Sequence, residues 1–125
     1  MEKFDNGAVW FGCWHTGLKS GHFGSPGNPH YALKLGKTQK TGSLNIIVPF
    51  FPFTSKKSKK CILELPPGEL NCGRQDAVSY LMPFRLLILK HKLEKKYTHK
   101  SFLSEARCQE ALRNYKEILN ARKMK

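Results

Sequence analysis

Lysine is the residue type whose spacing in this sequence points most directly to a chemistry. The stretch "SKKSKK" at residues 55–60 places four lysines within five positions, and phenylalanines precede it at positions 50, 51 and 53. Cationic side chains that neutralise phosphates release counterions and gain affinity, while aromatic rings stack on unpaired bases. The alternative for the phenylalanines is packing in the core. The pattern predicts a nucleic-acid contact made by Lys56, Lys57, Lys59 and Lys60.

A second and larger basic cluster spans residues 85–100. One arginine and five lysines fall within it, accompanied by a tyrosine and two histidines. Because it holds more cations, we expect this cluster to make the main contact and the 56–60 stretch a second one. Its predicted binding residues are Arg85, Lys90, Lys92, Lys95, Lys96, Lys100 and the aromatic Tyr97.

The charge balance of the whole chain favours the same class of ligand. The 125 residues contain 22 Lys and Arg against 9 Asp and Glu, a net charge of +13, and residues 71–125 carry thirteen basic and five acidic residues. Such an excess creates a positive field that attracts polyanions. Lysine outnumbers arginine seventeen to five, and lysine acts as a point charge where arginine reads bases bidentately. We therefore expect a non-enzymatic protein that binds RNA or single-stranded nucleic acid with little sequence specificity, as in a ribonucleoprotein.

Two other interpretations remain open at this point. The protein could instead be a small interaction or inhibitor protein that docks on an acidic protein partner, through its basic face or an amphipathic C-terminal helix. A poorly folded chain is the third interpretation, because segments 17–30 and 66–75 are rich in glycine, proline and asparagine. The "SKKSKK" stretch also has the form of a nuclear-import signal.

Catalytic and metal-binding patterns are weak. Acidic residues are scarce, and no pair of them has the spacing expected of a general acid and base. Cys13, His15 and His22 could bind a metal, but structural zinc sites show cysteine pairs two to four residues apart. The four cysteines are widely separated instead. The sequence predicts no enzymatic activity, no metal and no cofactor.

The same residues predict a cellular location. The N-terminus lacks an apolar stretch of the length found in signal peptides, and no run approaches the roughly 18–20 apolar residues of a membrane span. We expect an intracellular protein, cytoplasmic or nuclear, without a membrane span. The oligomeric state is left open.

Alternating apolar residues predict strands in the first half of the chain. The expected strands cover residues 7–16, 30–35, 43–51 and 60–65, with the third weakened at its end by Pro49. Glycine-rich and proline-rich stretches at 17–30, 36–42 and 66–73 separate them. This half is expected to be mainly β from residue 7 to residue 66.

The second half predicts helices. "DAVSYLM" could form a short helix capped by Asp76, and apolar residues in 83–97 recur at intervals of three and four, although "FRLLIL" also suits a buried strand. Residues 104–125 form the clearest pattern, an amphipathic helix that begins at Ser104. We expect residues 76–124 to be mainly α. The predicted fold is one α+β domain: a small antiparallel sheet of about four strands followed by two or three C-terminal helices.

Overall fold

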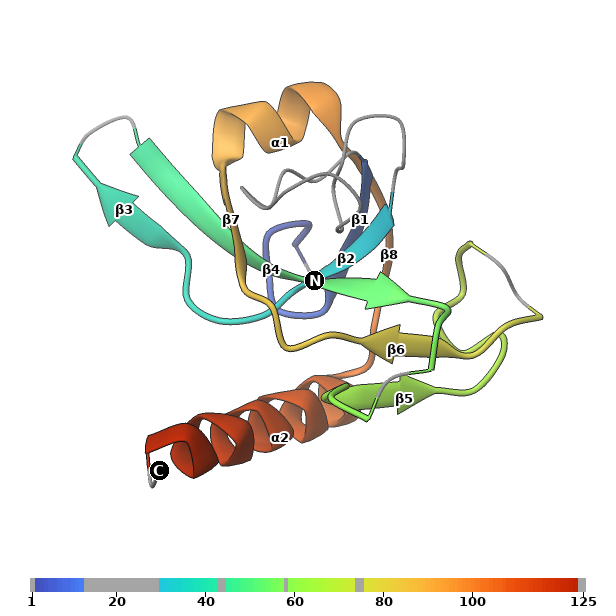
Figure 1. The fold of residues 1–125 in the computed structure, drawn as a ribbon. Coiled ribbons are helices and arrows are strands. Elements are labelled where there is room, and N and C mark those ends of the chain that lie inside the picture. Colours follow the sequence, from blue (N-terminus) through green and yellow to red (C-terminus); the bar gives the residue numbers. More distant parts are fainter. Residues whose placement is uncertain (1, 13–29, 43–44, 58, 74–75, 124–125) are drawn as a thin grey trace.

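The computed structural model describes residues 2–12, 30–42, 45–57, 59–73 and 76–123 of the chain. Within these residues an eight-stranded antiparallel sheet curls into a half-barrel, with one helix at each end (Figure 1). In chain order the elements are β1 (Ala8–Gly12), β2 (His30–Lys34), β3 (Gln39–Thr41), β4 (Asn45–Thr54), β5 (Leu63–Leu65), β6 (Ser79–Leu81), β7 (Leu86–Leu89), α1 (Lys90–Lys96), β8 (Thr98–Phe102) and α2 (Glu105–Lys123).

The predicted fold class is wrong, because the molecule is mostly β. Three of the eight strands, β6, β7 and β8, lie in the stretch 76–124 that was expected to be mainly α. The helix expected over 83–97 begins only at Lys90, and the apolar run before it pairs as β7 with β4. Sheet pairing supplies partners for the backbone of this run and buries Leu86, so it overrides the helical spacing of its leucines. The C-terminal helix is confirmed as α2.

Strand β4 organises the sheet. One edge pairs with β2 and β3 and the other with β6 and β7, so that Ile47 lies between Gln39 and Leu89. The β6–β7 edge is interrupted around Pro83, which cannot donate a backbone hydrogen bond. The Met82 amide, just before this proline, still donates to the Pro52 carbonyl at 2.9 Å. The order β5-β6-β4-β2-β1-β8 then extends the sheet on both sides.

Strand β4 is buried on both of its faces. Along β4, Val48 and Phe50 enter the apolar core on the α1 side, whereas Phe51 and Phe53 enter the core on the α2 side. Successive side chains of a strand point to opposite faces, so a strand covered on both faces requires a nearly continuous apolar run. This explains the sequence "IIVPFFPF" better than an aromatic binding surface would.

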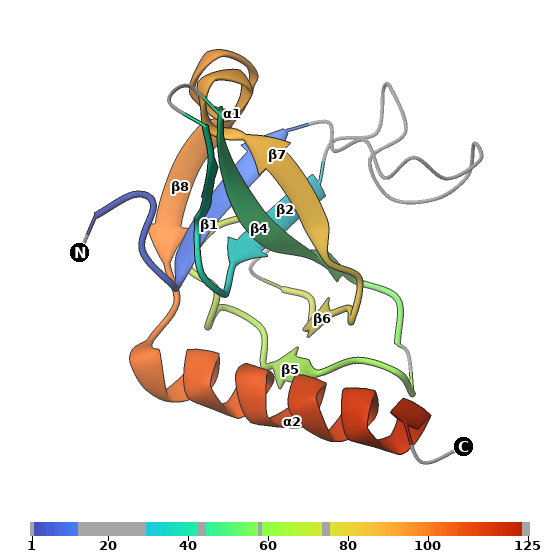
Figure 2. The ribbon, with the colours of Figure 1, turned by 90° about the vertical axis from the view of Figure 1, so that its left-hand side faces the viewer.

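Helix α2 covers the larger core. Its residues Cys108 and Ala111 are buried, and Tyr115 packs edge-on against Phe51 with ring centroids 4.9 Å apart. The Asn114 side-chain amide donates to the Ile62 carbonyl at 2.8 Å and fixes the helix beside β5. Figure 2 shows α2 running beneath the sheet, at the end opposite α1.

Helix α1 covers the smaller core through one residue. Leu93 is fully buried with Trp10 and Phe50 beneath it, while the rest of the helix is mostly exposed. Tyr97 ends the helix, and its ring lies so close to Gly12 that a Cβ there would be 2.0 Å from its Cδ1 atom. Neither α1 nor α2 is both long and apolar enough to cross a membrane.

Candidate nucleic-acid interface

The first lysine cluster lies in the connection between β4 and β5. Lys56, Lys57, Lys59 and Lys60 are all exposed. The connection turns directly after β4, where the Lys56 amide donates to the Thr54 hydroxyl at 3.2 Å. Phe50, Phe51 and Phe53, which precede it, are buried in the two cores. They therefore anchor the connection and do not project onto the outer surface beside the lysines.

The second cluster is spread over three elements around α1. Lys92, Lys95 and Lys96 project from the exposed part of the helix, and Arg85 is exposed before β7. Lys100 is the extra residue of a bulge in β8, because Val9 pairs with Ser101 and Trp10 with His99. Lys90 is half-buried, and its ammonium lies 4.7 Å from the centroid of the Phe4 ring.

Tyr97 was predicted to bind the ligand together with this cluster. Its half-buried ring packs against Gly12 and the α1-side core. In this position the ring supports the helix, and only part of it is accessible.

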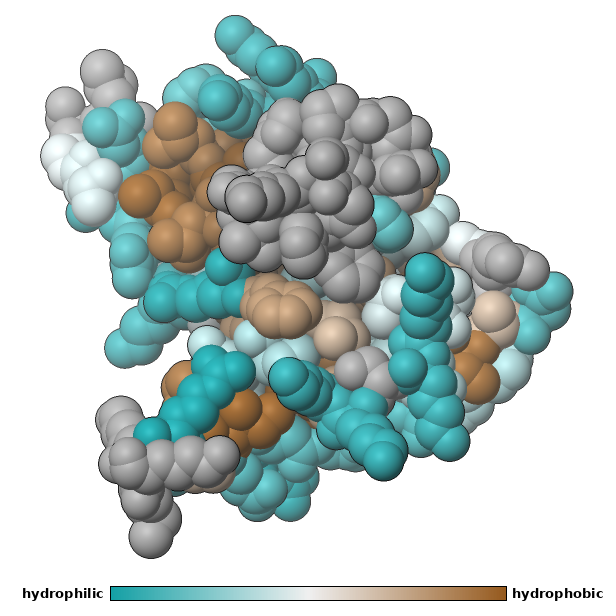
Figure 3. Space-filling view, in the orientation of Figure 1, coloured by the Kyte–Doolittle hydropathy of each residue, from teal (hydrophilic) through white to brown (hydrophobic). Residues whose placement is uncertain are grey.

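The two clusters do not form one surface. Helix α1 lies at one end of the sheet, and the connection carrying the first cluster lies toward the opposite end, where α2 is found (Figures 1 and 2). On the face seen in Figure 3, hydrophilic side chains project at several separate points. A bound strand would meet the clusters as two distinct contacts.

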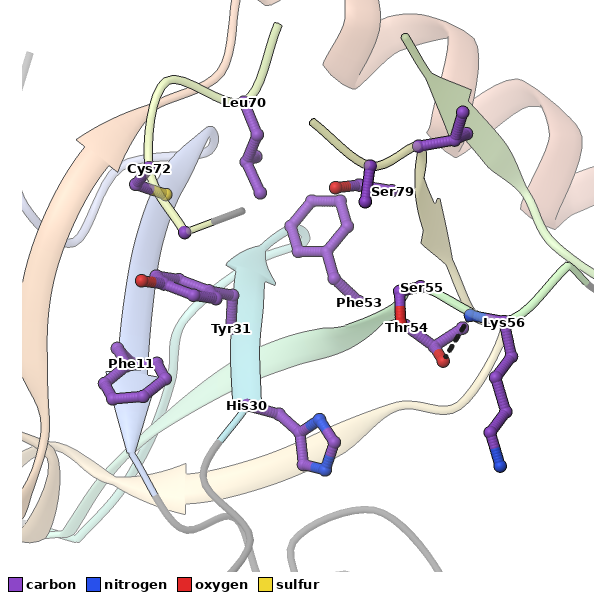
Figure 4. Close-up of a pocket in the computed structure, with 13 residues that line it drawn as sticks. Phe11, His30, Tyr31, Phe53, Thr54, Ser55, Lys56, Leu70, Cys72 and Ser79 are labelled. Carbon is purple, nitrogen blue, oxygen red and sulfur yellow. Dashed lines mark hydrogen bonds between the residues drawn. The ribbon is translucent and has the colours of Figure 1, made fainter. Parts of the chain in front are cut away.

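A pocket opens beside the first cluster (Figure 4). Its cavity volume is about 280 Å³, near the lower end of the range typical of small-molecule sites. Phe53 forms its floor, and Lys56 follows the hydroxyl residues Thr54 and Ser55 at its rim. The rest of the lining comes from Phe11, His30, Tyr31, Leu70, Cys72, Gly73, Ala77, Val78 and Ser79.

The aromatic wall of this pocket is held in place by close contacts. Phe11 of β1 and Tyr31 of β2 are cross-strand partners whose ring centroids lie 4.6 Å apart. Gly73 lies against the Tyr31 ring, because a Cβ at this residue would be only 2.7 Å from Cε2. Ser101 ties the neighbouring segment to β8, since its hydroxyl donates to the Leu70 carbonyl at 3.1 Å. The wall is therefore preformed.

The titratable groups of the pocket lining are uncharged at neutral pH, apart from Lys56. Burial lowers the pKa of His30 below its usual 6.5, which favours the neutral imidazole. Burial likewise raises the pKa of the Tyr31 hydroxyl and of the Cys72 thiol, so that both stay protonated. The pocket thus combines apolar rings and neutral polar groups with one cation at its rim.

The sequence analysis did not identify this pocket. Phe11 and Tyr31 come from different strands, and their contact depends on the register of β1 against β2. The usable signal was a large aromatic residue near the end of the first expected strand, Phe11, and near the start of the second, Tyr31. Cys13, His15 and His22, considered above as metal ligands, lie outside the described residues. In the described part of the chain, no group of three or more His, Cys, Asp or Glu side chains could hold a metal ion.

Comparison with known proteins identifies no matching family model, no similar curated protein and no similar solved structure. A functional assignment must therefore come from the chemistry of this surface.

Proposed function

We propose that the protein binds RNA or single-stranded nucleic acid, without cleaving it, through its exposed lysines. One observation carries the proposal: Lys56, Lys57 and Lys59 of the first cluster are exposed. In the described part of the chain, ion pairs join Lys3 with Glu94 and Arg107 with Glu69 and Glu110, and none involves Lys56, Lys57 or Lys59. These lysines can exchange their counterions for phosphates.

The form of the surface supports single strands over duplexes read in the major groove. Direct readout of duplex DNA requires a helix or ribbon inserted into that groove, with arginine or amide side chains reaching base edges. Helix α1 has only seven residues and presents lysines. Lysine contributes charge without bidentate geometry, so the binding has little sequence specificity. We place this function inside the cell, in the cytoplasm or nucleus, where the protein would join a ribonucleoprotein.

A salt titration tests the proposal. Filter binding of a mixed-sequence 20-nucleotide RNA is measured between 50 and 300 mM salt, and the logarithm of affinity should fall linearly with the logarithm of salt. For single strands the slope is about −0.7 per phosphate contacted, so Lys56, Lys57 and Lys59 alone should give a slope of about −2. Absence of binding at 50 mM salt, or a slope near zero, would overturn the proposal. Recovered RNA should be of full length, and shortened RNA would contradict binding without cleavage.

A further inference from the structure

The pocket beside the first cluster lies at the edge of the α2-side core, because Phe53 and Leu70 belong to that core and also line the pocket. The rest of its lining includes residues of β1, β2, the end of β4 and β6. It begins where the lysine connection begins, because Thr54 ends β4 and Lys56 lies on its rim. The pocket and the lysine connection are therefore adjacent on the molecule.

We propose that this pocket takes one unpaired base of the bound strand, with the adjoining phosphate at Lys56. The inference rests on the proposed function and deepens it. The lysines contact only the phosphate backbone of the strand, and the pocket adds a contact with one base. The inference assigns the pocket to the nucleobase class of ligand. Phe11 and Tyr31 form the stacking wall, and Thr54, Ser55 and Ser79 supply hydroxyls toward the base edge and sugar.

The chemistry of the lining suits a neutral, flat, polar-edged ring. Aromatic side chains stack on any base through its π-face, so one pocket can serve strands of any sequence. Hydroxyl groups both donate and accept hydrogen bonds and therefore match each base edge without strict discrimination. Burial lowers the pKa of His30, which favours its neutral imidazole at this side of the pocket. Only the rim carries a charge, where a phosphate would lie.

The preformed wall matters for affinity. Phe11 and Tyr31 are already in contact at 4.6 Å, and Gly73 keeps the Tyr31 ring from turning away. Little side-chain entropy is then lost when a base enters. Because a base must leave its stack to enter, a single strand binds at lower cost than a duplex. The pocket therefore makes the protein prefer single strands, which lysines alone would not do.

Three oligonucleotides with identical phosphates test the inference. The first is twelve thymidines, the second has an abasic sugar at all twelve positions, and the third has abasic sugars with one thymine at the centre. We expect the abasic strand to bind about tenfold more weakly than the thymidine strand, the scale of one stacked base. The single thymine should restore most of that loss, because the pocket holds one base.

The possible outcomes separate this inference from the proposed function. If abasic and thymidine strands bind equally well, lysines bind the backbone but the pocket takes no base. If the single thymine restores nothing, the pocket does not act alone and the inference is overturned. If none of the strands nor RNA binds, the proposed function fails and the inference fails with it.

A pair of variants tests whether the preference for a thymidine strand over an abasic strand depends on the pocket. Phe11→Leu should reduce the difference between the thymidine and abasic strands to less than about threefold, while leaving the salt slope unchanged. Phe4→Leu is the matched control, since Phe4 is a partly buried aromatic residue that stacks on Trp10 in the α1-side core. It should leave the difference intact. A fluorescent purine at the central position of the wild-type complex gives a further readout, because stacking quenches it, and undiminished emission would contradict a base in the pocket.

Discussion

The two lysine clusters are alike in composition, but the structures that adjoin them differ. The first adjoins an open pocket, whereas the lysines of α1 stand over a core closed by Leu93, which is fully buried. Both present exposed ammonium groups, and among the described residues a pocket lined by Lys56 adjoins the first. That the larger cluster at 85–100 makes the main contact stays a prediction. The comparison teaches that two clusters of similar charge can adjoin different surfaces, so the surface around a charge must be considered together with its density.

The largest expected effect concerns the apolar core beneath α1. Leu93→Ala should lower the free energy of unfolding by about 2–5 kcal/mol, because it leaves a cavity at a fully buried position. Urea denaturation measures the loss. Leu87→Ala, on the adjacent strand at 53% exposure, is the control and should cost less than about 0.5 kcal/mol. Among molecules that remain folded, the affinity for RNA should not change, and a fall would show that α1 shares in the main contact.

Removing equal charge from each cluster compares them directly. Lys56, Lys57 and Lys59 are changed together to alanine in one variant, and Lys92, Lys95 and Lys96 in the other. At 0.1 M salt each lost phosphate contact costs about fivefold in affinity, so the first variant should bind RNA about 100-fold more weakly. The second should bind less than about threefold more weakly, because we propose that the strand is held chiefly at the first cluster and its pocket. Equal losses of RNA affinity in the two variants, measured by filter binding, would contradict a larger role for the first cluster.

The pocket wall can be disturbed without altering charge. Gly73→Ala forces a Cβ to within 2.7 Å of the Tyr31 ring, whereas Gly42→Ala meets nothing within 4 Å at a similar positive φ of 79°. Both variants should lose about 1 kcal/mol from the strained backbone. Gly73→Ala should lose about 1 kcal/mol more through overpacking, and it should also reduce the preference for a thymidine strand over an abasic strand. Equal unfolding midpoints in urea for the two variants would show that Tyr31 is free to move.

The smallest effect is a dependence of stability on pH. Burial lowers the pKa of His30 in the pocket and of His99, whose ring lies between Trp10 and Phe102 on the α1 side. The unfolded chain takes up protons near pH 6.5 more readily than the folded one, so stability is complete above that pH and falls as the pH drops below it. The melting temperature should be lower at pH 5.5 than at pH 7.5.

Replacing each histidine by asparagine assigns this dependence to its region. His99→Asn should reduce the difference in melting temperature between pH 5.5 and pH 7.5 by the contribution of the α1 side. His30→Asn should reduce the same difference by the contribution of the pocket. A profile unchanged by both substitutions would place the titration on other groups.

Local patterns predicted part of this structure. The strands expected at 7–16, 30–35, 43–51 and 60–65 correspond to β1, β2, β4 and β5 with shifted ends, and the helix at 104–125 to α2. These segments have strong periodicity or long apolar runs, so local preference and tertiary burial agree. The nearly continuous apolar run before the first lysine cluster reflects burial on both faces of β4.

The missed elements depend on distant partners. Strand β8 reads "THKSF", a polar segment whose pairing is specified by β1 at the other end of the chain. Strand β6 has three residues and gains stability only between β4 and β5. The pocket escaped prediction for the same reason, since the contact between Phe11 and Tyr31 arises from register. The lysines were visible in the sequence, but their neighbours were not.

The pairing of β1 with β8 determines when this sheet can be completed. Ala8 of β1 pairs with Phe102 of β8, so β1 is synthesised long before the strand that pairs with one of its edges. Strand β4 likewise emerges before β6 and β7, which occupy one of its edges. Such non-local pairing makes folding slow compared with proteins built from local contacts. The apolar N-terminal half is thus synthesised before its partners exist, and a nascent chain stalled before residue 98 would expose both edges of an unfinished sheet.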